Sequence, residues 1–182
     1  TVGQNTVRAT SPGLTPVDFS ANGIAAQASK LVINSSASQS GFAGSPVTFP
    51  PSVKVTDSNN NPVQGVTVTF TVQTGAGVVS DGTGSGPTAT VATNPSGIAT
   101  LASWTLGPVT GPNSLTATPT GTGITPASIP FSATAALRPT ATTITADTPD
   151  PSVVGQPYPV NYTVAATVAG TGSPTGNVTV SD

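Results

Sequence analysis

The chain has 182 residues, a formal net charge of −2 and charged side chains at only 5% of its positions, against about 25% in an ordinary soluble domain. It contains no His and no Cys, which excludes a Ser–His–Asp triad, a cysteine nucleophile and a His/Cys zinc site, so we expect no enzyme. Its four basic residues are scattered, whereas nucleic-acid binding needs clustered Lys and Arg, so no nucleic-acid partner is expected. No apolar run approaches the ~20 residues of a membrane helix, so we expect no membrane span.

Residues 1–28 predict two short strands joined by a turn. Apolar residues alternate with polar ones in residues 5–10 and again in residues 16–21, and the tripeptide Ser-Pro-Gly at 11–13 is typical of a turn. Two strands cannot bury an apolar face by themselves. We therefore expect Val17 and Phe19 to lie away from the core of the rest of the chain.

The stretch at residues 53–72, VKVTDSNNNPVQGVTVTFTV, predicts a strand, a turn and a second strand. Its period of two indicates that one face meets a core and the other meets solvent, with Thr67, Thr69 and Thr71 outward. Together with later strands it predicts a buried core. The expected members are Val53, Val55, Val66, Val68, Phe70, Val72, Leu101, Trp104, Leu115, Ala117, Ile129 and Phe131.

Further strands are predicted on both sides of this stretch, at residues 30–35, 78–79, 88–93, 98–106, 113–118 and 128–134. Residues 41–51, broken by Gly and Pro, are expected to form a loop. In residues 98–106 the apolar residues switch from one face of the predicted strand to the other. Both sets can point inward only if one extra residue is inserted, which predicts a β-bulge near Ala102 and Ser103. Pro130 cannot donate a backbone hydrogen bond, so it is expected at a sheet edge or a bulge.

An internal repeat is visible in the sequence. GPNSLTAT at 111–118 resembles GQNTVRAT at 3–10, and Phe-Ser-Ala occurs at both 131–133 and 19–21. The period of roughly 110 residues is close to the ~100 of an immunoglobulin-type sandwich. It predicts the C-terminal strands of a preceding module in residues 1–28, one complete module in residues 29–138, and the N-terminal part of a following module in residues 139–182.

The third piece contains strand candidates at residues 141–146, 158–168 and 176–182. The junction before it, at Arg138 and Pro139, is expected to be short and stiff because proline fixes its own φ and restricts the residue before it. Without a signal peptide or an initiator Met, the chain is interpreted as a processed protein or a piece of a longer one.

Residues 30–134 resemble the bacterial immunoglobulin-like domains of the invasin and intimin type, through VKVTDSNNNPVQGVTVTF, ATNPSGIATLASWTLG and GPNSLTAT. Residues 140–182 resemble a second group of such repeats, through TPDPSVVGQPYPVNYTV and SPTGNVTVSD. The resemblance implies an all-β chain of tandem immunoglobulin-like Greek-key sandwiches, one complete and two partial. It further implies an extracellular, cell-surface location and a structural role in a cell-adhesion protein.

Few side chains are candidates for a site. Asp147 and Asp150 could form a calcium clamp, because Ca²⁺ prefers carboxylate and carbonyl oxygens, but two turn residues are the favoured interpretation. The segment Asp-Ser-Asn-Asn-Asn at 57–61 also resembles a calcium loop, and a β-turn explains it better. The Gly-rich residues 82–86 lack the Lys and helix of a phosphate-binding loop. Trp104 is interpreted as a core anchor and not as a ligand-stacking residue.

Two function classes remain open. The first is a stalk or spacer module of a bacterial cell-surface adhesin or giant extracellular repeat protein, with neighbouring immunoglobulin-like modules as its partners. The alternative is a subunit of an extracellular filament, assembled from copies of the chain by β-strand complementation. A carbohydrate- or protein-binding module is a weaker possibility because aromatic residues make up only 4% of the chain.

Overall fold

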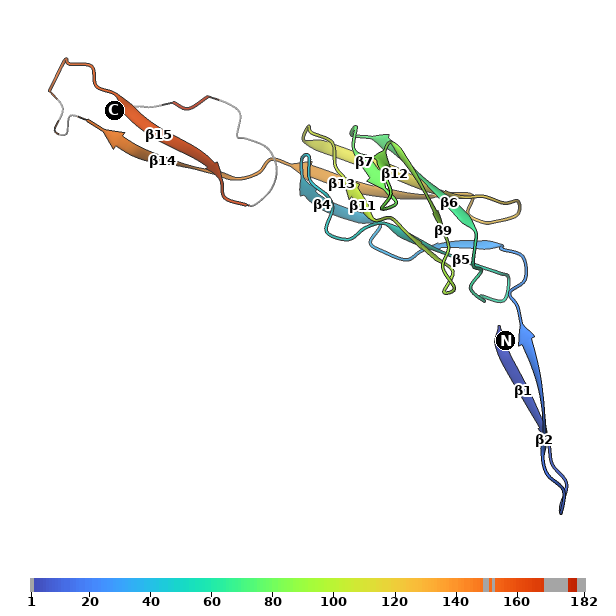
Figure 1. The fold of residues 1–182 in the computed structure, drawn as a ribbon. Helices are drawn as coiled ribbons and strands as arrows, with labels where there is room; N and C mark the ends of the chain where they lie inside the picture. Colours follow the sequence, from blue (N-terminus) through green and yellow to red (C-terminus); the bar gives the residue numbers. More distant parts are fainter. Residues whose placement is uncertain (1, 149–150, 152, 169–176, 180–182) are drawn as a thin grey trace.

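A computed structural model describes residues 2–148, 151, 153–168 and 177–179. These residues contain strands and turns but no helix, so the prediction of an all-β chain is confirmed. Nor do they offer any helical segment with the length and hydropathy needed to cross a membrane. Figure 1 shows three parts: a hairpin near the N-terminus, a layered central module, and a second hairpin near the C-terminus.

The central module is built from three sheets. A three-stranded sheet has the order β10-β5-β3, a five-stranded sheet has the order β4-β13-β12-β6-β9, and a small sheet has the order β11-β7-β8 (Figure 1). All pairs are antiparallel except β4 with β13, which is parallel. The strands are β3 (Lys30–Ile33), β4 (Ser38–Phe42), β5 (Ser52–Thr56), β6 (Thr67–Thr74), β7 (Val78–Ser80), β8 (Ser85–Gly86), β9 (Thr88–Ala92), β10 (Ile98–Thr100), β11 (Ser103–Thr105), β12 (Gly111–Pro119) and β13 (Ile129–Ala136).

One hydrophobic core lies between these sheets. Alternation along β6, β12 and β13 turns every second residue inward, and the inward residues meet those of β5 and β11. The predicted core residues are buried except Val66 and Val72, which are half-buried. Thr67, Thr69 and Thr71 are half-buried instead of exposed, because β6 lies inside its sheet and β12 and β9 flank it on both sides.

The phase change in residues 98–106 has a different origin from the predicted bulge. β10 pairs with β5, whereas β11 pairs with β7 in another sheet. Between them Leu101 N–H donates to Pro51 O (3.1 Å) and Ala102 N–H donates to Ser80 O (2.8 Å), so the chain crosses from one sheet to the next at this point. The crossing buries the apolar residues on both sides of it, including Leu101 at 2% exposure and Trp104 at 0%.

Two strands were not expected from the sequence. β4 overlaps the predicted loop at residues 41–51, and β8 lies in the Gly-rich segment. Neither has alternating large apolar residues, so the sequence pattern gives no signal for them.

The placement of Pro130 agrees with the prediction of an edge or bulge. Ser132 N–H donates to Ala37 O (2.9 Å), on the β4 side of β13. Pro130 lies two residues earlier, so its nitrogen faces the same side, at a point where β4 has not yet begun to pair. The missing N–H therefore leaves no ladder hydrogen bond unmade.

A two-stranded hairpin extends from each end of the central module (Figure 1). The first consists of β1 (Gly3–Ala9) and β2 (Val17–Gly23), and the second of β14 (Thr140–Asp147) and β15 (Val160–Ala166). Of the strand predicted at residues 176–182, only residues 177–179 are described, and they are not in a strand; the rest lies outside the described residues.

Candidate interaction surfaces at the two ends of the chain

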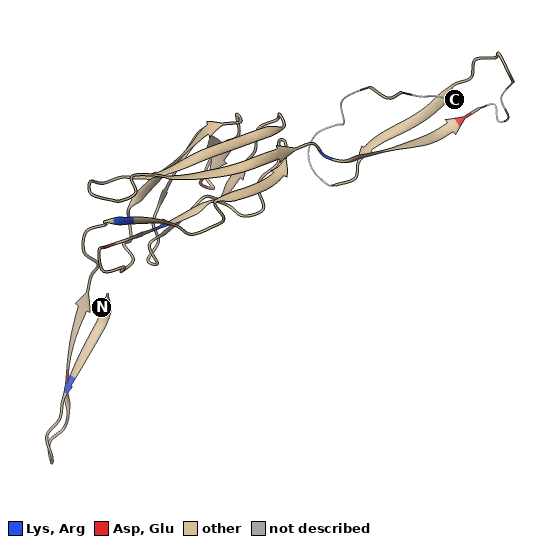
Figure 2. Cartoon of the chain, turned by 180° about the vertical axis from the view of Figure 1, so that it is seen from behind, with Lys and Arg blue, Asp and Glu red and all other residues tan. Residues whose placement is uncertain are grey.

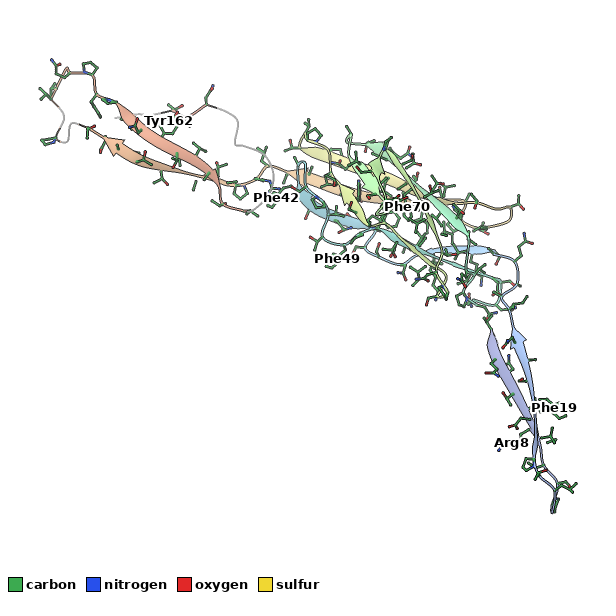
Figure 3. The ribbon with its side chains drawn as sticks, in the orientation of Figure 1. Arg8, Phe19, Phe42, Phe49, Phe70 and Tyr162 are labelled. Atoms are coloured by element: carbon green, nitrogen blue, oxygen red, sulfur yellow. The ribbon has the colours of Figure 1, made fainter. Side chains whose placement is uncertain are left out.

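The N-terminal hairpin has one apolar face. Val7 lies opposite Phe19 and Ala9 lies opposite Val17, so these side chains share one face of the two-stranded sheet. Val7 is 69% exposed, Val17 53% and Phe19 62%. Figure 3 shows Phe19 on this hairpin, far from Phe70 in the central core. The expectation that Val17 and Phe19 lie away from the central core is confirmed.

The other face of this hairpin is polar. Arg8 and Asp18 lie opposite each other and form a two-armed ion pair, with Nε to Oδ1 at 2.7 Å and the second guanidinium nitrogen to Oδ2 at 2.8 Å. The hydrogen bond from Arg8 lowers the pKa of the Asp18 carboxyl below its usual value. Both side chains are exposed, and a pair of this kind contributes little to stability. The hairpin is therefore amphipathic, with one face suited to water and the other to a core.

The C-terminal hairpin presents a similar face. Ile144 lies opposite Tyr162 and Thr142 opposite Val164, and Ile144 is 62% exposed and Tyr162 45%. Val160, two residues before Tyr162, faces the same side and is half-buried, as is Val164. Both ends of the chain thus carry a two-stranded sheet with exposed apolar side chains on one face.

Arg138 ties the central module to the C-terminal hairpin. Its guanidinium carbon lies 5.3 Å from the centroid of the Phe42 ring, and it donates to Ser45 Oγ and to Val168 O (3.4 Å). On the next residue, Pro139 O accepts from Thr167 N–H (2.9 Å) and from Thr167 Oγ1 (3.1 Å). The junction therefore has specific contacts beyond the conformational limits of proline; its stiffness stays a prediction.

Asp57 lies at the junction between the N-terminal hairpin and the central module. Its carboxylate is 1% exposed and accepts from Asn61 Nδ2 and from the backbone N–H groups of Ala26, Asn59 and Asn61, each at 2.9 Å. The side-chain bond from Asn61 is the largest cause of a pKa lowered to about 2 for Asp57. Through Ala26 the carboxylate connects the turn at residues 57–61 to the segment that follows β2.

The segment that resembles a calcium loop is a turn in the structure. Asn60 N–H donates to Asp57 O (3.1 Å), and Asn60 has a positive φ of 65°. The Lys30 ammonium donates to Ser58 O (3.0 Å) and Asn60 Oδ1 (2.8 Å), so a lysine already engages two of the oxygens that a cation would need. These contacts favour the β-turn interpretation.

The first backbone donors of the Gly-rich residues 82–86 are occupied. Asp81 Oδ1 accepts from Thr83 N–H (2.8 Å), from Thr83 Oγ1 (2.8 Å) and from Gly84 N–H (3.3 Å). The bond from Thr83 N–H is the largest cause of a lowered pKa for Asp81. The carboxylate of the loop itself thus lies where a bound phosphate would accept these hydrogen bonds.

The remaining candidates are Asp147, Asp150 and Trp104. Asp147 is the last residue of β14 and not a turn residue, and Asp150 lies outside the described residues. Within the described part of the chain, no cluster of three or more His, Cys, Asp or Glu side chains could hold a metal ion. Figure 2 shows how sparse and scattered the charged residues are. Trp104 is fully buried, as expected of a core anchor.

The sequence has been compared with family models and with curated proteins. No family model matches the chain, and no curated protein matches it. The functional argument therefore depends on the geometry of the hairpins and junctions.

Proposed function

We propose that the chain is a structural spacer: a stalk module of a bacterial cell-surface adhesin or giant extracellular repeat protein. One observation carries the proposal. A sandwich with a closed core stands between two hairpins that extend from opposite ends and expose apolar faces (Figure 1). An element of this kind is joined to a neighbour at each end. Its role is to set the distance and direction between whatever the neighbours carry.

Three further features support this proposal. The non-sequential order of the two larger sheets, β10-β5-β3 and β4-β13-β12-β6-β9, is compatible with an immunoglobulin-like Greek key. The motifs that resemble bacterial immunoglobulin-like domains cover both the module and the C-terminal hairpin. The polar side chains of the surface are mostly Thr, Ser and Asn, which suits a solvated strand face without charge.

Small-angle scattering of the whole chain tests the proposal. We expect an elongated particle in which the hairpins extend away from the central module, because Pro139 and the contacts of Arg138 hold the C-terminal hairpin at the end of the sandwich. A compact, near-spherical particle would contradict a spacer. Digestion of intact source cells with an added protease tests the location, since a surface protein is cleaved while cytosolic markers stay intact.

The second candidate is a filament subunit, which the two exposed apolar faces also favour. The tail of one copy and the head of the next would together build a sandwich, as in donor-strand complementation. Residues 1–28 and 140–182 together are shorter than the ~100 residues of this fold, so the spacer is the first choice. Sedimentation over a range of concentrations separates the two, because only the filament subunit lengthens into chains as its concentration rises.

A further inference from the structure

We infer that the N-terminal hairpin closes a second sandwich of the same type as the central module, supplied by a segment equivalent to residues 30–108 of this chain. The inference rests on the proposed spacer function and names the partner of this hairpin. Its basis is that β1–β2 and β12–β13 have the same strand register, although they lie more than a hundred residues apart.

The register correspondence extends along the whole hairpin. The shift that aligns GQNTVRAT with GPNSLTAT, and the separate shift that aligns Phe-Ser-Ala at 19–21 with 131–133, together map every cross-strand pair of β1–β2 onto a pair of β12–β13. The matching pairs are Gly3↔Gly23 with Gly111↔Ala135, Asn5↔Ala21 with Asn113↔Ala133, Val7↔Phe19 with Leu115↔Phe131, and Ala9↔Val17 with Ala117↔Ile129. A slip of one residue would have put the apolar set on the opposite face.

The corresponding residues have opposite exposure in the two hairpins. Leu115 is 0% exposed and Phe131 1%, whereas Val7 and Phe19 are 69% and 62% exposed. On the polar faces, the Arg8–Asp18 pair corresponds to Thr116 and Pro130, which also face outward. The N-terminal hairpin therefore has the inner and outer faces of a sandwich sheet without the layer that covers the inner one.

The central module shows which strands the partner must provide. β12 pairs along its other edge with β6, antiparallel, and β13 pairs along its other edge with β4, parallel. Among the described residues β1 and β2 pair only with each other. By the same register, the partner brings a β6-like strand to β1 and a β4-like strand to β2.

An asparagine narrows the choice of partner further. Asn113 Nδ2 donates to Gly111 O (3.2 Å), and its Oδ1 accepts from Gly107 N–H (2.9 Å). A Cβ on Gly75 would collide with this Oδ1, and a Cβ on Gly107 would collide with Gly75 O, so glycine is required at both positions. Asn5 makes the equivalent bond from Nδ2 to Gly3 O (3.0 Å). The partner of β1 is therefore expected to carry glycines at the positions equivalent to Gly75 and Gly107.

The test is a longer chain in which a second copy of residues 30–108 is joined directly to Thr1. This junction keeps the spacing, because Gly3 then follows the copy as Gly111 follows residue 108 in the central module. Hydrogen exchange of the β1 and β2 amides is measured in this chain and in the original one. A lone hairpin is marginally stable and a core strand opens only with its module, so we expect exchange at least ~10³-fold slower in the longer chain.

Three variants make the test specific. Phe19→Asp is expected to abolish the protection in the longer chain, while the matched control Leu14→Asp, at a site that is 71% exposed, leaves it in place. Asn5→Ala is expected to reduce the protection roughly tenfold in the longer chain, because a buried N–H of the copy loses its acceptor. In the original chain the hairpin amides already exchange fast, so the same change is expected to have no measurable further effect on them.

Equal, fast exchange of β1 and β2 in both chains would overturn the inference, as would a copy that stays unfolded beside the hairpin. Protection in the original chain that rises with concentration would overturn it as well, since a second copy would then cover the face. The spacer proposal is tested separately by scattering. An elongated particle with unprotected β1 and β2 amides would contradict this inference but support the spacer. A compact particle would contradict the spacer.

Discussion

Asp57 is the buried carboxylate of the module, and its hydrogen bonds give it a defined acid sensitivity. Its pKa is lowered to about 2 in the folded chain, whereas an Asp in an unfolded chain titrates near 3.9. A lowered pKa means that the ionised carboxylate stabilises the fold. This contribution to stability is complete at a pH above the pKa of the unfolded chain, and it is lost as the pH falls toward the pKa of the folded chain.

We therefore expect the stability contribution of Asp57 to be constant above about pH 4 and to decline between about pH 4 and pH 2, while its contacts in the folded chain are lost only as the pH falls through the folded pKa of about 2. Amide signals of Ala26, Asn59 and Asn61 in an NMR titration report this directly, because these groups donate to the carboxylate. The Asp57→Asn variant is the control, since it has no proton to gain. Signals of the native protein that move only above pH 5 would show the assignment to be wrong.

Phe70 tests the core at the level of one side chain. It is 0% exposed in the middle of β6, so Phe70→Ala is expected to lower the free energy of unfolding by about 3–5 kcal/mol through lost burial and a cavity. Urea unfolding followed by the fluorescence of the buried Trp104 measures this loss.

Phe49 is the matched control for Phe70, because it is the same residue type at 62% exposure. Phe49→Ala is expected to change the stability by no more than about 0.5 kcal/mol. Equal losses in the two variants would contradict the placement of the core.

At the scale of elements, the junction between β13 and β14 depends on Arg138. Removing its side chain in Arg138→Ala deletes the contacts to Phe42, Ser45 and Val168. We expect a wider distribution of distances between the central module and the C-terminal hairpin, measured with spin labels on the two parts. The unfolding midpoint of the module is expected to change little, because its core does not include Arg138.

The Arg138→Lys variant tests whether the positive charge of Arg138 or the planar shape of its guanidinium fixes this junction. Lysine keeps the positive charge but lacks the planar guanidinium that stacks on an aromatic ring. We expect its distance distribution to lie closer to that of Arg138→Ala than to that of the native chain. A distribution in Arg138→Ala as narrow as the native one would show that Pro139 alone sets the geometry.

Much of the element order could be predicted because it depends on local alternation. The strands around Val53, Phe70 and Leu115 follow from a period of two, and the repeat of Asn5 and Phe19 in β12–β13 follows from sequence similarity. β4 could not be predicted, because it is held by parallel pairing with β13 and not by apolar residues of its own. The contacts of Arg138 come from the end of β4, the loop after it and the segment after β15, so no sequence spacing indicates them.

The candidate sites, like the strands, could be predicted only where the signal is local in the sequence. The turn at Asp57 was recognisable from composition, but the groups that fix it were not, because Lys30 and Ala26 reach Asp57 and its turn from distant positions in the sequence. The apolar faces of the hairpins were predicted from alternation, and their exposure follows from the lack of any described element against them.

At the scale of the whole molecule, the interpretation that Asp147 and Asp150 form no calcium clamp predicts that the stability does not depend on calcium. We expect the thermal midpoint to be the same in excess Ca²⁺ and in a chelator, because a cation that binds only the folded state would raise it. A rise that is specific to Ca²⁺ and is removed by Asp147→Asn would instead support a clamp. Mg²⁺ at the same concentration controls for screening.

The parallel pairing of β4 and β13 has a mechanical consequence for a chain that lies between two neighbours. β4 is near the start of the module, and β13 leads directly into the C-terminal hairpin (Figure 1). A pull on the two ends draws these strands in opposite directions past each other. Their ladder, which joins Ser38 to Ser132 and Phe42 to Ala136, is then loaded in shear across all of its hydrogen bonds together instead of being opened one bond at a time. The module resists tension at the place where the chain leaves it.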